Sequence, residues 1–80
     1  MSEPKEANSR KLVWVVDDDE TVLLLAEEVL ASEGFRAETF VDAQRALDST
    51  ARNLPDIVVL DVLLPGMNGF EFCSRLRALP

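Results

Sequence analysis

Apolar residues are grouped along this chain in a way that predicts three strands. Residues 12–16 and 57–60 are continuous apolar runs, and a run without alternation is typical of a strand covered on both faces. Trp14 lies inside the first run and is expected in the core. Residues 35–40 form a short run that is more polar than the first, which indicates a second strand at an edge of the sheet.

A helical period follows the first strand. Apolar residues at i, i+3, i+4, i+7 and i+8 form the stripe that we expect this helix to bury: Val22, Leu25, Ala26, Val29 and Leu30. Leu23 and Leu24 lie off this stripe, and the pattern does not place them. Asp19 is interpreted as an acid that starts the helix, and Gly34 as the C′ residue that ends it.

A second helix is expected between the second and third strands. Asp42 is its expected N-cap, and its weaker stripe consists of Ala43, Ala46, Leu47, Thr50 and Ala51. The third strand is followed by residues 63–69, which are dense in turn-forming residues and predict a loop.

The last helix is expected to begin near Gly69. Its spacing turns Phe72, Cys73 and Leu76 to one side, and Cys73 is interpreted as a small hydrophobic residue of the core. Phe70 and Phe72 are likewise assigned to the core or to its partly buried border, rather than to a stacking surface. The order strand, helix, strand, helix, strand, helix indicates an α/β fold with a parallel sheet and right-handed crossovers.

Composition narrows the class of protein. The chain has 80 residues, a hydrophobic fraction of 48%, and a net charge of −7 from 8 basic and 15 acidic residues. These values favour a single globular domain at most and argue against a nucleic-acid surface, which needs clustered basic residues. One cysteine forms no internal disulfide, and the absence of histidine excludes common zinc sites and histidine-based triads.

The chain carries no recognisable targeting signal. Residues 1–10 are polar and are interpreted as a flexible lead-in without the apolar stretch of a secretory signal. The apolar runs are far shorter than the ~20 residues that span a bilayer. The expectation is a cytoplasmic protein in a reducing compartment, with no membrane partner.

Acidic residues follow two of the expected strands directly. Asp17 and Asp18 end the first strand, and Asp61 ends the third. Taken alone, each is most simply a helix cap or a solvated acid, and Asp19 is interpreted in that way. Because the carboxyl ends of parallel strands share one edge, three carboxylates would converge there if the two strands are neighbours. Such a cluster favours a hard divalent cation, and Mg²⁺ fits best.

Three segments together resemble the receiver domain of bacterial two-component response regulators. They are VVDDDE at 15–20, PDIVVLD at 55–61 and LPGMNGFE at 64–71. The resemblance implies a flavodoxin-like, doubly wound parallel sheet of order 2-1-3-4-5. Only its first (βα)3 portion, with strand order 2-1-3, is expected within 11–80, which would form an incomplete receiver domain.

The resemblance also implies roles for individual residues. Asp61 matches the phosphoacceptor, and Asp17 and Asp18 match the acidic pair that binds Mg²⁺. Leu63 matches the position whose backbone carbonyl also ligates the metal. The implied phosphoryl donor is a sensor histidine kinase or a phosphotransfer protein. Three loop residues match those that shape the path into the last helix: Pro65, Gly66 and Gly69.

The chain departs from the family pattern at its end. The family carries a Ser or Thr after a fourth strand and a Lys after a fifth, and Pro80 comes before either. We therefore expect a fragment of a longer chain. Without a fourth strand, residues 57–60 would form an unprotected edge, which predicts self-association through the third strand.

Two other functions are weighed against phosphotransfer. The first is an interaction module that dimerises without phosphorylation. The second is an aspartate-nucleophile phosphohydrolase, which needs an acid two residues after the nucleophile, where this chain has Leu63. No glycine-rich phosphate loop follows any strand, which argues against a nucleotide site. The sequence thus favours a signalling domain and not an enzyme.

Overall fold

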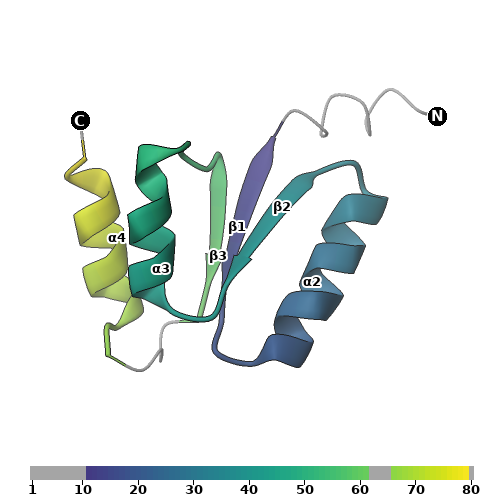
Figure 1. Ribbon diagram of the computed structural model, residues 1–80, viewed down its shortest axis with the longest axis horizontal. Helices are drawn as coiled ribbons and strands as arrows, with labels where there is room; N and C mark the ends of the chain where they lie inside the picture. The colour runs from purple at the N-terminus through teal and green to yellow at the C-terminus, as the bar shows by residue number, and fades with distance from the viewer. Residues whose placement is uncertain (1–10, 62–65, 80) are drawn as a thin grey trace.

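The computed structural model describes residues 11–61 and 66–79 (Figure 1). The expected roles of Leu63 and Pro65, and the lead-in at 1–10, lie outside these residues. The elements in chain order are β1 (Leu12–Val16), α2 (Glu20–Ser32), β2 (Arg36–Phe40), α3 (Ala43–Asp48), the 3-10 turn η1 (Ser49–Ala51), β3 (Ile57–Leu60) and α4 (Gly69–Arg77).

The three strands form one parallel sheet in the order β2-β1-β3, which confirms the predicted topology. Figure 1 shows the strands running in the same direction, with α2 on one face of the sheet and α3 and α4 on the other. β1 is the central strand, and all five of its residues are buried, as its unbroken apolar run predicts.

Alternate residues of β1 contribute to two separate hydrophobic cores. Trp14 and Phe72 are fully buried in the α3/α4 core, which also contains Leu12, Val16, Phe40, Ala43, Ala46 and Met67. The rings of Trp14 and Phe40 meet edge to face, with their centroids 5.0 Å apart. The α2 core is formed by Val13, Val15 and Leu23, with Ala26, Leu30, Phe35 and Val41 packed against it.

The predicted buried stripe of α2 is wrong in part. Leu23, which the pattern did not place, is the buried residue of this helix, while Val22, Leu25 and Val29 are 41%, 57% and 61% exposed. Among the described elements, α2 packs mainly over β2 and β1. Its apolar residues cover a wider arc than these two strands can bury, so one side of the arc stays in solvent.

The helix ends follow the predictions. The Asp19 carboxylate accepts from the N–H groups of Thr21 and Val22, and Gly34 follows the C-cap of α2 with a φ of 89°. This left-handed conformation is the one that glycine adopts at little cost. The Asp42 carboxylate caps α3 by accepting from the N–H of Arg45 at 2.8 Å.

In α4, one of the two phenylalanines assigned to the core is not there. Phe72 is fully buried, with Cys73 and Leu76 packed beside it, as predicted. Phe70 is 81% exposed. The two residues are two positions apart, which is about 200° around a helix, so one helix cannot turn both toward the same core. Across the described parts of the chain, no helix has the length and hydropathy needed to cross a membrane.

The burial difference between these two phenylalanines gives a matched pair of variants. We expect Phe72→Ala to lower the free energy of unfolding by about 3–5 kcal/mol, because it empties a packed site. Phe70→Ala should change it by about 0.5 kcal/mol or less. Urea denaturation followed by circular dichroism measures both values. Equal losses in the two variants would contradict the assignment of α4's inner face.

Candidate functional site

The predicted acidic residues lie at the carboxyl ends of β1 and β3. The N–H of Asp61 donates to the carbonyl of Val16 at 3.1 Å, and the N–H of Asp17 donates to the carbonyl of Phe40 at 3.1 Å. These bonds extend the sheet ladder by one residue beyond the strands. The backbone of both aspartates is therefore held by the sheet rather than by a loop.

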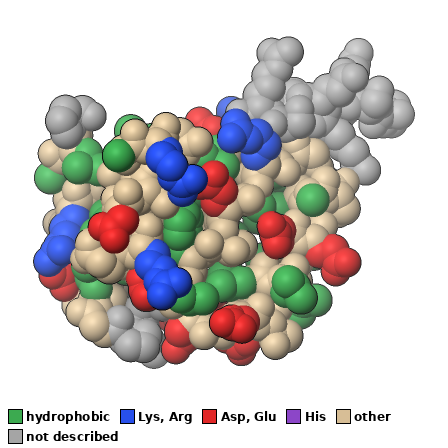
Figure 2. All heavy atoms as spheres, in the orientation of Figure 1, with side chains coloured by type: hydrophobic (Ala, Val, Ile, Leu, Met, Phe, Trp, Pro, Cys, Tyr) green, Lys and Arg blue, Asp and Glu red, His purple; other side chains and the backbone are tan. Residues whose placement is uncertain are grey.

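Asp17, Asp18 and Asp61 form a cluster of carboxylates. Each offers an oxygen, and these oxygens all lie within 4.8 Å of one another. Asp17 and Asp61 are half-buried, and Asp18 is exposed. Figure 2 shows acidic side chains along the lower edge of the molecule, where the strands of Figure 1 end. The structure thus brings together the three aspartates that the sequence predicts to converge at this edge.

Asp19 is oriented toward the helix and lies outside this cluster. One of its carboxylate oxygens accepts from Thr21 N–H at 2.9 Å and from Val22 N–H at 3.4 Å. Its own N–H donates to Oδ1 of Asp17 at 2.9 Å. Asp19 therefore has two roles. Its carboxylate caps α2, and its backbone N–H orients the carboxylate of Asp17.

The path into α4 starts at Gly66. Its φ of 83° lies in the left-handed region, which glycine adopts at little cost. The side chain of Asn68 then caps α4 by accepting from the N–H of Glu71 at 2.8 Å. Gly69 is buried as the first residue of the helix. Two of the three predicted loop residues are thus described, and both lie at positions where the backbone changes direction.

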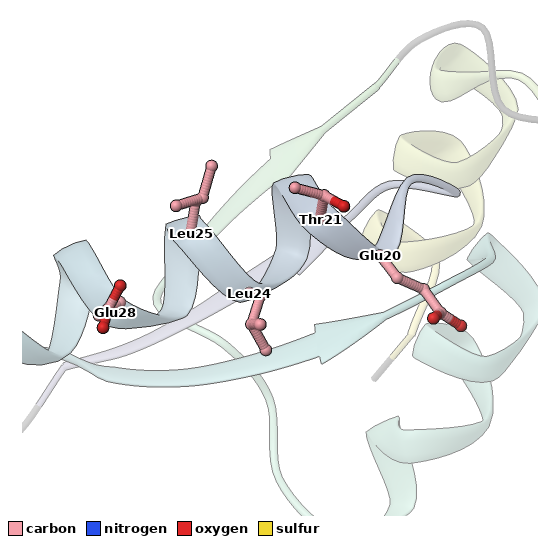
Figure 3. Close-up of a pocket in the computed structure, with 5 residues that line it drawn as sticks. All are labelled: Glu20, Thr21, Leu24, Leu25 and Glu28. Carbon is pink, nitrogen blue, oxygen red and sulfur yellow. The ribbon is translucent and has the colours of Figure 1, made fainter.

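A hollow of about 350 Å³ lies on the surface of α2 and not at the carboxylates. It is lined by Glu20, Thr21, Leu24, Leu25 and Glu28, all from one helix (Figure 3). Side chains of a single exposed helix cannot enclose a ligand. The chemistry of the described residues is therefore best sought at the carboxylate cluster.

The cluster has the composition of a site for a hard cation. Three carboxylates this close repel one another. A divalent cation among them would attract all three and so offset that repulsion. Oxygen ligands suit Mg²⁺, which takes one or two carboxylates and retains water or phosphate oxygens in its other positions. The aspartates present fit such an ion.

Comparison with known proteins places this arrangement in a family. The family model for the response regulator receiver domain matches residues 13–80. The chain belongs to the response regulator receiver domain family. Response regulator PleD of Caulobacter vibrioides is 44% identical to it over 68 residues, which are 85% of this chain and 15% of PleD. The receiver domain described here is therefore a two-component signalling domain by family.

Solved structures of receiver domains share its fold. The chemotaxis response regulator CheY4 of Vibrio cholerae is 31% identical, with a TM-score of 0.80 over 85% of this chain and 57% of that one. The complex of histidine kinase ThkA with response regulator protein TrrA matches with 31% identity and a TM-score of 0.79, over 88% of this chain and 60% of that one. The chain thus spans less than two thirds of each of these relatives.

One residue near the sheet was given no role from the sequence. The carboxylate of Asp56 accepts from the N–H of Leu12 at 2.7 Å. An acid between Pro55 and an apolar run is the only signal that the sequence offers for this contact. Its partner lies 44 residues away, so no local pattern indicates the bond.

The separate tasks of Asp18 and Asp19 predict opposite effects on stability. Asp18→Asn, measured without divalent cations, should raise the melting temperature by a few degrees, because it removes like-charge repulsion. Asp19→Ala should lower the free energy of unfolding by about 1 kcal/mol, because it removes the cap of α2. Thermal and urea denaturation in a chelating buffer test both. A stabilising Asp19→Ala, or a strongly destabilising Asp18→Asn, would contradict this division.

Proposed function

We propose that this receiver domain accepts a phosphoryl group on Asp61 with the help of Mg²⁺. The observation that carries the proposal is the approach of the Asp17, Asp18 and Asp61 carboxylate oxygens to within 4.8 Å. Mg²⁺ would be held by these three side chains and by the backbone carbonyl of Leu63, which lies outside the described residues. Bound there, it supplies positive charge against the phosphoryl oxygens.

Asp61 is the nucleophile in this proposal. A carboxylate oxygen of Asp61 bonds to phosphorus as the nitrogen–phosphorus bond of a donor phosphohistidine breaks, and the imidazole leaves with the electron pair. The product is an acyl phosphate on Asp61. Because the ladder bond from its N–H holds the backbone at the end of β3, the nucleophile is oriented before the donor arrives.

We infer that the physiological donor is a phosphohistidine on another protein. The chain contains no histidine, so it cannot form a phosphohistidine of its own. We propose a sensor histidine kinase or a phosphotransfer protein as the partner. The similarity to a response regulator that has been solved in complex with a histidine kinase supports this choice. The acceptor is half-buried at the edge of the sheet where β1 and β3 end, and this edge is the face that such a partner would approach.

Mg²⁺ should stabilise the folded chain. A ligand that binds only the native state adds about 2.7 kcal/mol at a hundredfold excess over its Kd. We expect a rise in melting temperature with millimolar Mg²⁺ in the wild type and a much smaller rise in Asp18→Asn and Asp61→Asn. Differential scanning calorimetry over a Mg²⁺ series measures it.

A variant with the same change in charge serves as the control for this titration. Glu27→Gln lies on the exposed face of α2, and it should keep the full Mg²⁺ response. A wild type whose melting is insensitive to Mg²⁺ would show that the cluster is not a metal site. An equal loss of response in Glu27→Gln would reduce the effect to net charge.

Phosphorylation should occur at Asp61 alone. A small acyl-phosphate donor with Mg²⁺ should add one phosphoryl group to the wild type and none to Asp61→Asn, because the amide is not a nucleophile. Intact-mass spectrometry detects the addition, and reduction of the acyl phosphate with borohydride marks the residue. Label on any other aspartate would reject the assignment.

A second candidate function is association with a second copy of this chain through β3. Within the described residues, no strand pairs with the outer edge of β3. Ile57 and Val59 are 44% and 52% exposed. They lie on the α2 side of the sheet, where α2 packs mainly over β1 and β2. The strand has neither a Lys nor a Pro to protect it. A second β3 edge offers the same backbone groups and the same apolar residues, so two copies are self-complementary.

Association through β3 predicts a concentration-dependent mass. We expect sedimentation equilibrium to show dimers at high micromolar concentration in the wild type, and Val59→Lys to shift them to monomers because it places a charge on the strand. Leu24→Lys makes the same change in charge on α2, at a residue that is 70% exposed, and should leave association unchanged. A wild type that remains monomeric throughout would reject this function and leave phosphotransfer untouched.

A further inference from the structure

Two hydrogen bonds between Asp56 and Leu12 join the start of β3 to the start of β1. Asp56 N–H donates to the carbonyl of Leu12 at 2.8 Å, and the Asp56 carboxylate accepts from the N–H of Leu12 at 2.7 Å. The second bond is made by a charged side chain, and charge-assisted hydrogen bonds of this length are stronger than those between neutral groups. Asp56 therefore holds both backbone groups of a single partner.

Leu12 is a partner that needs both bonds. It is 4% exposed and belongs to the α3/α4 core, so its backbone groups are shielded from water. A buried N–H without an acceptor is costly. Pro55, the residue before Asp56, has no N–H to contribute to the ladder. The carboxylate of Asp56 thus provides the acceptor at the point where the ladder begins.

The position of this contact matches the position of the carboxylate cluster. Leu12 is five residues before Asp17, and Asp56 is five residues before Asp61. Between them the pairing runs without interruption from Val13 with Ile57 to Val16 with Leu60. A contact that aligns the strands at one end therefore determines which residues meet at the other.

We propose that Asp56 is a positioning residue for the site: by holding Leu12 it sets the register of β3 against β1 and so brings Asp61 to Asp17. The effect on metal binding and phosphotransfer rests on the proposed function, whereas the effect on register does not. A slip of one residue would turn the side chain of Asp61 to the opposite face of the sheet. The cluster would then lose the residue that connects it to β3.

The variants compare Asp56 with a second aspartate that makes the same kind of bond. Asp56→Ala removes the acceptor, while Asp56→Asn retains a side-chain oxygen at the same reach. Asp42→Ala removes a carboxylate that accepts from the N–H of Arg45 at 2.8 Å, so it matches the change in charge and in bond type away from β3. Asp56→Glu, which keeps the charge but displaces the oxygens by one methylene, replaces Asp56→Ala if the alanine variant does not fold.

Register is measured first, without metal. We expect amide exchange at Leu12 and at Asp61 to accelerate at least tenfold in Asp56→Ala, and to stay near the wild-type rates in Asp56→Asn and Asp42→Ala. Unchanged protection of both amides in Asp56→Ala would overturn the proposal. This outcome does not depend on whether the chain binds Mg²⁺ or accepts phosphate.

Metal affinity is measured second, by calorimetric titration with Mg²⁺ alone. Loss of a residue that supports metal ligands typically weakens affinity by about tenfold or more. We expect a loss of that size in Asp56→Ala, recovery in Asp56→Asn, and wild-type affinity in Asp42→Ala. Equal weakening in Asp56→Ala and Asp42→Ala would reduce the role of Asp56 to general stability. Failure of the wild type to bind Mg²⁺ would overturn the proposed function. The exchange rates at Leu12 and Asp61 would still test whether Asp56 holds β3 against β1.

Discussion

The parallel pairing of β1 with β3 is the constraint on which the site depends. Asp17 and Asp61 are far apart in the chain and meet only because Val16 lies opposite Leu60. Successive residues of a strand are about 3.3 Å apart, so a slip of one position is comparable to the whole width of the cluster. The sheet therefore sets the distance between the aspartates, and the helices hold the sheet in place by burying β1 on both faces.

Most of the fold could be predicted from local pattern. β1 and β3 are visible as unbroken apolar runs and β2 as a more polar one, and the helix ends at Asp19, Gly34 and Asp42 have the residue types that caps require. The meeting of the aspartates could be predicted as well, because parallel strands end at one edge. That β1 and β3 are neighbours could be predicted only from the family resemblance, because no periodicity within the strands specifies their order.

The parts that could not be predicted depend on what covers each surface. Leu23 and Val22 are adjacent and similarly apolar, and only the position of α2 over two strands decides that Leu23 is buried. Phe70 and Phe72 differ only in the direction they take from α4. The bond from Asp56 to Leu12 joins the ends of two strands, so it exists only once the sheet has formed.

The burial of β1 between two cores also bears on how the domain unfolds. Trp14 and Val16 belong to one core and Val13 and Val15 to the other, so a single strand is shared by both. Neither core can lose β1 without exposing the other, which makes the two a single cooperative unit in spite of their separation by the sheet. Local fluctuations are then confined to elements that one core holds alone. Because β1 leads directly into the aspartates, we expect the backbone at its carboxyl end to be among the last parts of the sheet to open.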